Sequence, residues 1–136
     1  MENKLLLYPV TMMFFLIIYL YVRNFLDNIK AKNSKKIKFS YFKTYQGEVP
    51  DYIAVSRQTL KNQFELPIFF YFLVSAIMAI DAVSRIDVFF AWSFVVSRYI
   101  HCYIRLTTNY VPHRAKLFKL GLLILIVWWI QFLISI

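Results

Sequence analysis

Four long apolar stretches occupy most of this chain and leave little room for anything except membrane-spanning helices. They run from Leu5 to Val22, from Phe64 to Ile80, from Val88 to Tyr110 and from Leu117 to Ile136. A helical span needs roughly 20 apolar residues, and this chain has 136 residues, of which 60% are hydrophobic. The sequence therefore predicts one all-α domain over residues 1–136, a bundle of four transmembrane helices, and excludes a soluble enzyme domain.

The first apolar stretch carries no charge between Lys4 and Arg23. A secretory signal peptide is the competing interpretation, but such peptides have a shorter apolar core and end in a small-residue cleavage site. No cleavage site of that kind precedes Arg23. We therefore expect this stretch to be the first membrane span.

The connection over residues 23–61 is strongly basic, in a chain whose formal net charge is +9. We expect residues 31–36 to be mobile, Gly47 to Pro50 to form a turn, and helix to resume near Asp51, which would cap it. A basic loop beside membrane spans favours anionic lipid headgroups as its partner over nucleic acid. Its basic residues are Arg23, Lys30, Lys32, Lys35, Lys36, Lys38, Lys43, Arg57 and Lys61.

The distribution of basic residues also predicts the orientation. Lys and Arg in short loops stay on the cytoplasmic side of a membrane. Residues 23–61 and 98–119 are rich in them, whereas the link over residues 81–87 holds only Arg85. We therefore expect a multi-pass protein with both termini on the non-cytoplasmic side, and we expect Pro112 to end the third helix.

Polar side chains recur at helical spacing in the second and third spans and just before the second. Ionisable groups at membrane depth cost at least ~2.5–3.5 kcal/mol each, so they are kept where they pair or function. Spacings of three, four and seven residues place side chains on one helix face. We expect the two faces to meet each other, or to face an adjacent subunit, across a common cavity. The two sets are Gln58, Asn62 and Glu65, and Arg98, His101, Arg105 and Asn109.

The charges in this expected cavity do not balance. Glu65 can neutralise one guanidinium, most simply that of Arg98, whereas Arg105 and Arg114 have no acidic partner in the second to fourth spans. Unpaired arginines bind carboxylates through two-pronged, charge-assisted hydrogen bonds. Asn62 offers a donor and an acceptor suited to an amide. The pattern favours a small anionic ligand.

A purely structural interpretation of the same residues remains open. Glu65 and Arg98 can form an interhelical ion pair, and Asn62 an interhelical hydrogen bond. Arg105 and Arg114 can extend to lipid phosphates. We expect Cys102 to be an apolar filler. A single cysteine without a Cys/His cluster predicts no metal site.

Two groups of residues within residues 51–120 resemble motifs of the MAPEG family, the membrane-associated proteins in eicosanoid and glutathione metabolism. The run NQFELPIFFY at residues 62–71 resembles the family signature that combines Asn, Glu, Pro and a Phe pair. Ala91-Trp92, Arg98-Tyr99-Ile100-His101, Asn109 and Arg114 resemble a second segment that is common in bacterial members. Together the two motifs are specific for the family.

The resemblance implies a homotrimer of four-helix subunits in the bacterial inner membrane, with glutathione bound between subunits in the cytoplasmic half. It implies a thiolate that attacks a lipophilic electrophile or reduces a hydroperoxide, activated by an arginine that lowers the thiol pKa. Arg114 is the candidate for that role. The residues that correspond to glutathione contacts are Asn62, Glu65, Arg98, His101 and Arg114.

Three positions depart from the eicosanoid enzymes of the family. Arg105 stands where they carry a tyrosine, Gln58 where they carry a glutathione-contacting arginine, and Ala115 where one member has a serine. Arg105 can restore the charge that Gln58 removes, so it is the second catalytic candidate. Gln58 and Asn109 remain candidates for ligand binding, and an eicosanoid synthase activity is not expected.

We therefore expect a glutathione-dependent transferase or peroxidase that acts on lipophilic small molecules. The alternative is a non-catalytic membrane scaffold or lipid-binding protein of the same fold. A small four-helix multidrug exporter fits poorly, because those exporters place an essential carboxylate in the first span, and residues 5–22 contain none.

Overall fold

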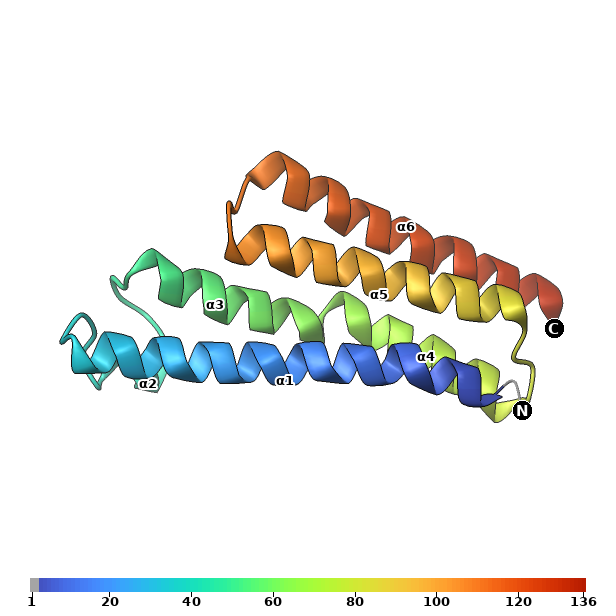
Figure 1. Ribbon diagram of the computed structural model, residues 1–136, viewed down its shortest axis with the longest axis horizontal. Helices are drawn as coiled ribbons and strands as arrows, with labels where there is room; N and C mark the ends of the chain where they lie inside the picture. The colour runs from blue at the N-terminus through green and yellow to red at the C-terminus, as the bar shows by residue number, and fades with distance from the viewer. Residues whose placement is uncertain (1–2) are drawn as a thin grey trace.

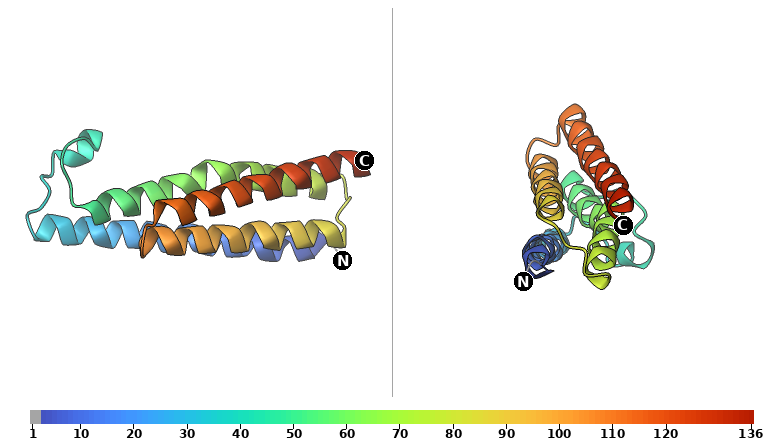
Figure 2. Two further views of the ribbon diagram at one scale, coloured as in Figure 1. Left: turned by 90° about the horizontal axis from the view of Figure 1, so that it is seen from above. Right: turned by 90° about the vertical axis from the view of Figure 1, so that its right-hand side faces the viewer.

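Long helices lie side by side along one axis in the computed structural model, which describes residues 3–136 (Figure 1). The start of α1 and the end of α6 lie at one end of the bundle, and the short α2 lies at the other (Figures 1 and 2). The all-helical prediction is confirmed. The elements are α1 Asn3–Asn33, α2 Tyr41–Thr44, α3 Asp51–Lys61, the 3-10 helix η1 Asn62–Phe64, α4 Leu66–Ala79, α5 Arg85–Leu106 and α6 Val111–Ser135.

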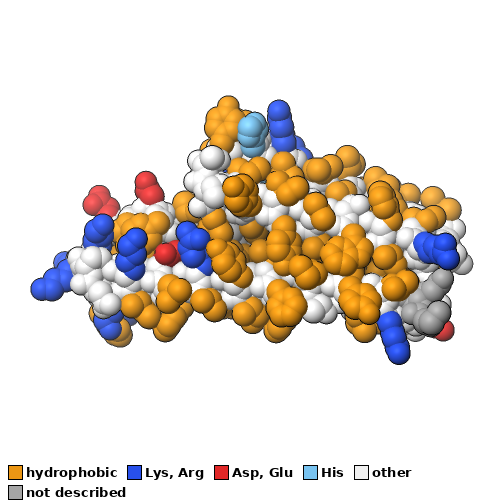
Figure 3. All heavy atoms as spheres, viewed as in Figure 1, with side chains coloured by type: hydrophobic (Ala, Val, Ile, Leu, Met, Phe, Trp, Pro, Cys, Tyr) orange, Lys and Arg blue, Asp and Glu red, His pale blue; other side chains and the backbone are white. Residues whose placement is uncertain are grey.

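Within residues 3–136, three helical segments are long and apolar enough to cross a membrane: Asn3–Asn33, Asp51–Ala79 and Val111–Ser135. Helix α5 has 22 residues and so reaches about 33 Å, which is about the thickness of a hydrocarbon core. Its polar residues lower its mean hydropathy. For this reason α5 does not stand out as a membrane span by length and composition alone. Hydrophobic side chains cover most of the face shown in Figure 3, as lipid contact requires.

The connection between the first two spans is more ordered than the sequence suggested. Helix α1 continues past Val22 to Asn33, and Ala31 is fully buried, so this part of the expected mobile segment is packed. Helix α3 begins at Asp51 as predicted, but the cap position belongs to Pro50 and Asp51 lies in the first turn. Gly47 has a φ of +114°, which fits the expected turn.

The second predicted span is interrupted near its start. Helix α3 ends at Lys61, η1 follows, and Glu65 has φ −102° and ψ −95°, outside the helical region. Pro67 lies in the first turn of α4, where its missing N–H is tolerated, whereas it could not continue α3 without losing a hydrogen bond. The break turns Gln63 into the protein interior and leaves Glu65 exposed.

Helices α5 and α6 are joined differently from the prediction. Helix α5 ends at Leu106, and α6 begins at Val111, earlier than the expected start at Leu117. Pro112 therefore starts the last helix rather than ending the third one. Asn109 lies in the link with a φ of +48°.

Asp87 holds the other ends of α5 and α6 together. One of its carboxylate oxygens accepts hydrogen bonds from Ser84 N at 2.8 Å and Ser84 Oγ at 2.6 Å, which completes a capping box at the start of α5. The second oxygen accepts from Trp128 Nε1 of α6 at 2.7 Å. Nearby, the rings of Phe70 and Phe94 stack at 4.9 Å. The described residues at this end of the bundle form a packed core.

Candidate functional site

An open cavity of about 220 Å³ lies between η1, α5 and the first turns of α6. Three of its lining side chains are cationic and none is a carboxylate. The structure thus brings together four of the predicted site residues, from three different elements. The lining residues are Asn62, His101, Arg105, Arg114, Ala115, Phe118 and Lys119.

Arg105 is held in place by two residues of α3. Its Nε donates to Thr59 Oγ1 at 3.0 Å, and its Nη2 donates to Gln58 Oε1 at 2.6 Å. The Thr59 hydroxyl itself donates to the Val55 carbonyl at 2.6 Å, so its oxygen is free to accept. Both partners of Arg105 are neutral, so its orientation is fixed while its charge is not compensated.

Arg98 is the most unusual charged residue of the bundle. Its exposed fraction is 0%, and none of its three guanidinium nitrogens has a hydrogen-bond partner among residues 3–136. The expected ion pair with Glu65 is not formed. In the described part of the chain the one ion pair within 4 Å joins Arg23 and Asp27, at 3.4 Å. The pair fails because the break before α4 leaves Glu65 exposed.

Phe118 separates Arg98 from the cavity. Its ring centroid lies 5.9 Å from the Arg98 guanidinium carbon and 6.2 Å from the His101 ring. Phe118 and His101 line the cavity, whereas Arg98 does not. The aromatic ring therefore covers the guanidinium on the cavity side.

His101 is buried at the wall of this cavity. Its Nδ1 has no hydrogen-bond partner among the described residues, and either ring nitrogen of a neutral histidine can donate or accept according to the tautomer. Asn62, at the first position of η1, lines the same cavity. The two side chains together offer hydrogen bonds of both kinds to a ligand.

Arg114 is positioned by Asn109. Its Nη1 donates to Asn109 Oδ1 at 2.6 Å. The sequence pattern predicted that Asn109 lies on the polar face of the third span. In the structure, Asn109 lies beyond the end of α5 and does not line the cavity. Asn109 and Gln58 each hold an arginine of the site, a role that their spacing did not predict.

The sequence model of the MAPEG family matches residues 6–134. The chain belongs to the MAPEG family. No curated protein and no solved structure matches it. Family membership and the long apolar helices together establish an integral membrane protein with the four-helix MAPEG fold.

The sequence analysis did not single out two buried polar residues beside the candidate site, Thr59 and Gln63. Gln63 has an exposed fraction of 0%, and its Nε2 donates to the Thr59 carbonyl at 3.2 Å and to Cys102 Sγ at 3.3 Å. The Thr59 hydroxyl oxygen also accepts the hydrogen bond from Arg105 Nε. The sequence feature that could have indicated their contact is the four-residue spacing of Thr59 and Gln63, which makes the two side chains neighbours on a helix. Cys102 is buried, as expected for a filler.

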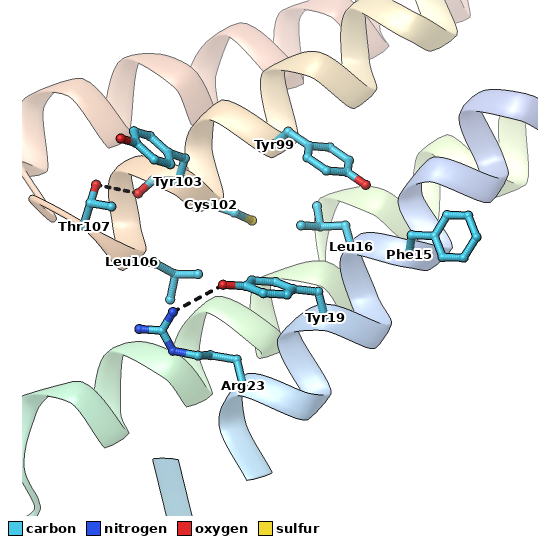
Figure 4. Close-up of a pocket in the computed structure, with 9 residues that line it drawn as sticks. All are labelled: Phe15, Leu16, Tyr19, Arg23, Tyr99, Cys102, Tyr103, Leu106 and Thr107. Carbon is cyan, nitrogen blue, oxygen red and sulfur yellow. Dashed lines mark hydrogen bonds between the residues drawn. The ribbon is translucent and has the colours of Figure 1, made fainter. Parts of the chain in front are cut away.

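A second hollow, of about 560 Å³, lies between α1 and α5 of the MAPEG bundle (Figure 4). Its walls are mainly apolar, and its α5 residues lie on a different face from those of the cationic cavity. Arg23 lies at one end and donates to the Tyr19 hydroxyl at 3.3 Å. The lining residues are Phe15, Leu16, Tyr19, Arg23, Tyr99, Cys102, Tyr103, Leu106 and Thr107.

Among residues 3–136, no group of three or more His, Cys, Asp and Glu side chains could hold a metal ion. The polar groups that line the cavity are guanidinium, ammonium, imidazole and amide groups. Such groups bind and orient anions and stabilise developing negative charge.

Proposed function

We propose that this MAPEG protein is a glutathione-dependent transferase or peroxidase that acts on lipophilic electrophiles. The observation that supports it most is the cavity that gathers Arg105, Arg114 and Lys119 without a carboxylate in its lining. Glutathione carries two carboxylates, two peptide amides and a thiol. Its carboxylates match the guanidinium groups, and its amides match Asn62 and His101.

The proposed roles follow from the contacts of each residue. Arg105 and Arg114 bind the carboxylates or the thiolate, because their charges are not neutralised by acidic neighbours. Gln58 and Asn109 act indirectly, by fixing the orientation of these arginines. Arg98 joins the ligand-binding set once Phe118 moves aside, since the ring covers its guanidinium.

The proposed chemistry requires a glutathione thiolate. A guanidinium close to the sulfur favours the charged form and so lowers the thiol pKa, and Arg114 is our candidate for that group. In the transferase reaction, the thiolate forms a bond to an electrophilic carbon and displaces a leaving group. In the peroxidase reaction, the thiolate forms a bond to the terminal oxygen of the hydroperoxide, the O–O bond breaks, and the protonated alcohol leaves. The thiol of a second glutathione then attacks the resulting sulfenic sulfur, which forms the disulfide and releases water.

We propose that the complete site forms between subunits of a homotrimer, with the cavity in the cytoplasmic half of the membrane. Glu65 belongs to the family signature but is exposed in the single chain. A neighbouring subunit would bring a ligand against that exposed surface, where Glu65 could receive the glutathione ammonium. The apolar outer surface supplies lipophilic substrates directly from the bilayer.

The test is calorimetric titration of the detergent-purified protein with glutathione, followed by turnover with a chloro-dinitrobenzene. We expect saturable binding by the wild type. Arg114→Ala should weaken binding about 10- to 100-fold, since a charge-assisted hydrogen bond contributes about 1.5–3 kcal/mol. Arg85→Ala removes an exposed cation at the opposite end of α5 and should change nothing. A wild type that does not bind glutathione would exclude the proposal.

A lipid-binding scaffold is the second candidate function. The observation that favours it is again the cationic lining, because Arg114 and Lys119 lie where α6 begins and suit a lipid phosphate as well as a carboxylate. Native mass spectrometry distinguishes the two candidates. Retained anionic lipid that glutathione does not displace, with no turnover, supports the scaffold.

A further inference from the structure

Residues 34–47 form a lysine-rich lobe around α2, at the end of the bundle opposite to the start of α1 (Figures 1 and 2). No acidic residue occurs between Asp27 and Glu48. Every lysine of this region is exposed. The lysines are Lys30 and Lys32 at the end of α1, and Lys35, Lys36, Lys38 and Lys43 in the lobe.

The lobe has a fixed position because it has its own small core. Ile37 and Tyr41 are buried against Ala31 of α1 and Ile53 of α3. In addition, the Arg57 guanidinium carbon lies 3.8 Å from the centroid of the Tyr45 ring. The lysines are therefore displayed by a packed unit that is attached to both flanking helices.

The lobe contains a hollow of about 600 Å³ that offers donors for phosphate groups. Lys35, Lys36 and Lys38 line it together with the hydroxyl-bearing side chains of Ser40 and Thr44. Tyr41 and Gln46 add further polar groups, and Glu48 is the one acidic residue in the lining. Three ammonium groups against one carboxylate leave the hollow net positive.

Exposed aromatic rings lie next to these lysines. Phe39 is 73% exposed and Tyr45 is 47% exposed. The Lys32 ammonium lies 5.3 Å from the centroid of the Phe39 ring. Exposed aromatic rings mixed with lysines are typical of surfaces that contact the headgroup layer of a membrane. A site for a soluble phosphate compound would not require an exposed phenyl ring.

The position of the lobe relative to the spans brings it within reach of the membrane surface. Helix α1 is continuous from Arg23, where the first apolar stretch ends, to Asn33, a length of about 15 Å. The headgroup layer adds roughly 5–7 Å to each side of the hydrocarbon core, and electrostatic attraction extends a further ~8 Å at physiological salt. The lysines therefore lie within the electrostatic field of that leaflet.

We infer that the lysine-rich lobe is a docking surface for anionic lipid headgroups in the adjacent leaflet, with Lys35, Lys36 and Lys38 as phosphate contacts and Phe39 as the aromatic contact. The surface is separate from the cationic cavity and does not depend on glutathione binding. Docking restrains residues 34–47 and slows the exchange of their amide hydrogens.

Hydrogen exchange of the full chain in lipid nanodiscs tests this inference. We expect the amides of residues 34–47 to exchange about threefold or more slowly in discs containing phosphatidylserine than in discs of phosphatidylcholine alone. The variant with Lys35→Gln, Lys36→Gln and Lys38→Gln should lose the difference between the two discs. A matched variant with Lys4→Gln, Arg85→Gln and Lys116→Gln removes three exposed cations elsewhere and should keep it.

Two further results would contradict the inference. Equal exchange of the wild-type lobe in both discs means that lipid charge is not recognised. Slow exchange that pyrophosphate reproduces in phosphatidylcholine discs means that the lobe binds a soluble polyanion instead. The exchange of α2 amides in phosphatidylcholine discs also shows whether the triple lysine variant is folded, since an unfolded lobe would exchange at the unprotected rate.

Discussion

Arg98 is a fully buried guanidinium without a hydrogen-bond partner among the described residues. A guanidinium without partners in the membrane interior is costly, so its surroundings must supply a compensating interaction or open to a ligand. The ring of Phe118, which lines the cavity, has its centroid 5.9 Å from the Arg98 guanidinium carbon. A cation over an aromatic face compensates part of that cost. Displacement of this ring would connect Arg98 with the cavity.

The substitution Phe118→Ala tests this arrangement. We expect the small apolar reagent phenylglyoxal to modify Arg98 at least about tenfold faster in this variant than in the wild type, because the covering ring is absent. Peptide mass spectrometry measures the modification. Phe89→Ala removes an exposed ring elsewhere on α5 and should leave the rate unchanged. Equal rates in the wild type and Phe118→Ala would show that Phe118 does not control access.

At the scale of elements, the contact between α5 and α6 depends on the buried carboxylate of Asp87. That carboxylate has donors from Ser84 on one side and from Trp128 on the other. Removing one partner of a buried carboxylate leaves an acceptor without a hydrogen bond, which costs about 1–3 kcal/mol.

Trp128→Phe should therefore lower the thermal midpoint of the detergent-solubilised protein by several degrees. The neighbouring Trp129→Phe is the matched control, because Trp129 is only half-buried and stacks on Phe72 without a hydrogen bond from its indole nitrogen in the described residues. Thermal unfolding followed by intrinsic fluorescence measures both. The same midpoint for both variants would show that the Asp87 bond contributes nothing specific.

The elements also show how far the sequence determines this molecule. Apolar stretches predicted the helices because bilayer thickness sets their length. The prediction from helical spacing failed at Glu65. Residues at that spacing share one face only on a continuous helix, and the helix is interrupted before Pro67. The prediction failed at Asn109 for a similar reason, because α5 ends at Leu106.

The residues that line the candidate cavity were predicted better than the contacts between them. Asn62, His101, Arg105 and Arg114 do meet at one cavity, because residues of adjacent helices at one depth must share a surface. Spacing could not show that Gln58 would hold Arg105, since that contact depends on how α3 packs on α5. The fully buried position of Gln63 likewise follows from the break in the helix.

The positions of the helix ends and of the basic residues predict how the whole molecule is oriented in the membrane. The start of α1 and the end of α6 lie at one end, and the lysine-rich lobe lies at the other (Figure 1). Because basic connections stay in the cytoplasm, we expect the lobe and the cationic cavity on the cytoplasmic side. The cavity would then face the compartment that supplies glutathione.

Single cysteines introduced into a Cys102→Ser background test this orientation. A membrane-impermeant maleimide added to intact cells should label Asn3→Cys and Ser135→Cys and should not label Lys36→Cys. After the cells are permeabilised, Lys36→Cys should become labelled, because Lys36 is exposed on the lobe. Labelling of Lys36→Cys in intact cells would place the lobe and the cavity outside. Glutathione would then have to be supplied from outside the cell, which would remove the reason for proposing it as the ligand.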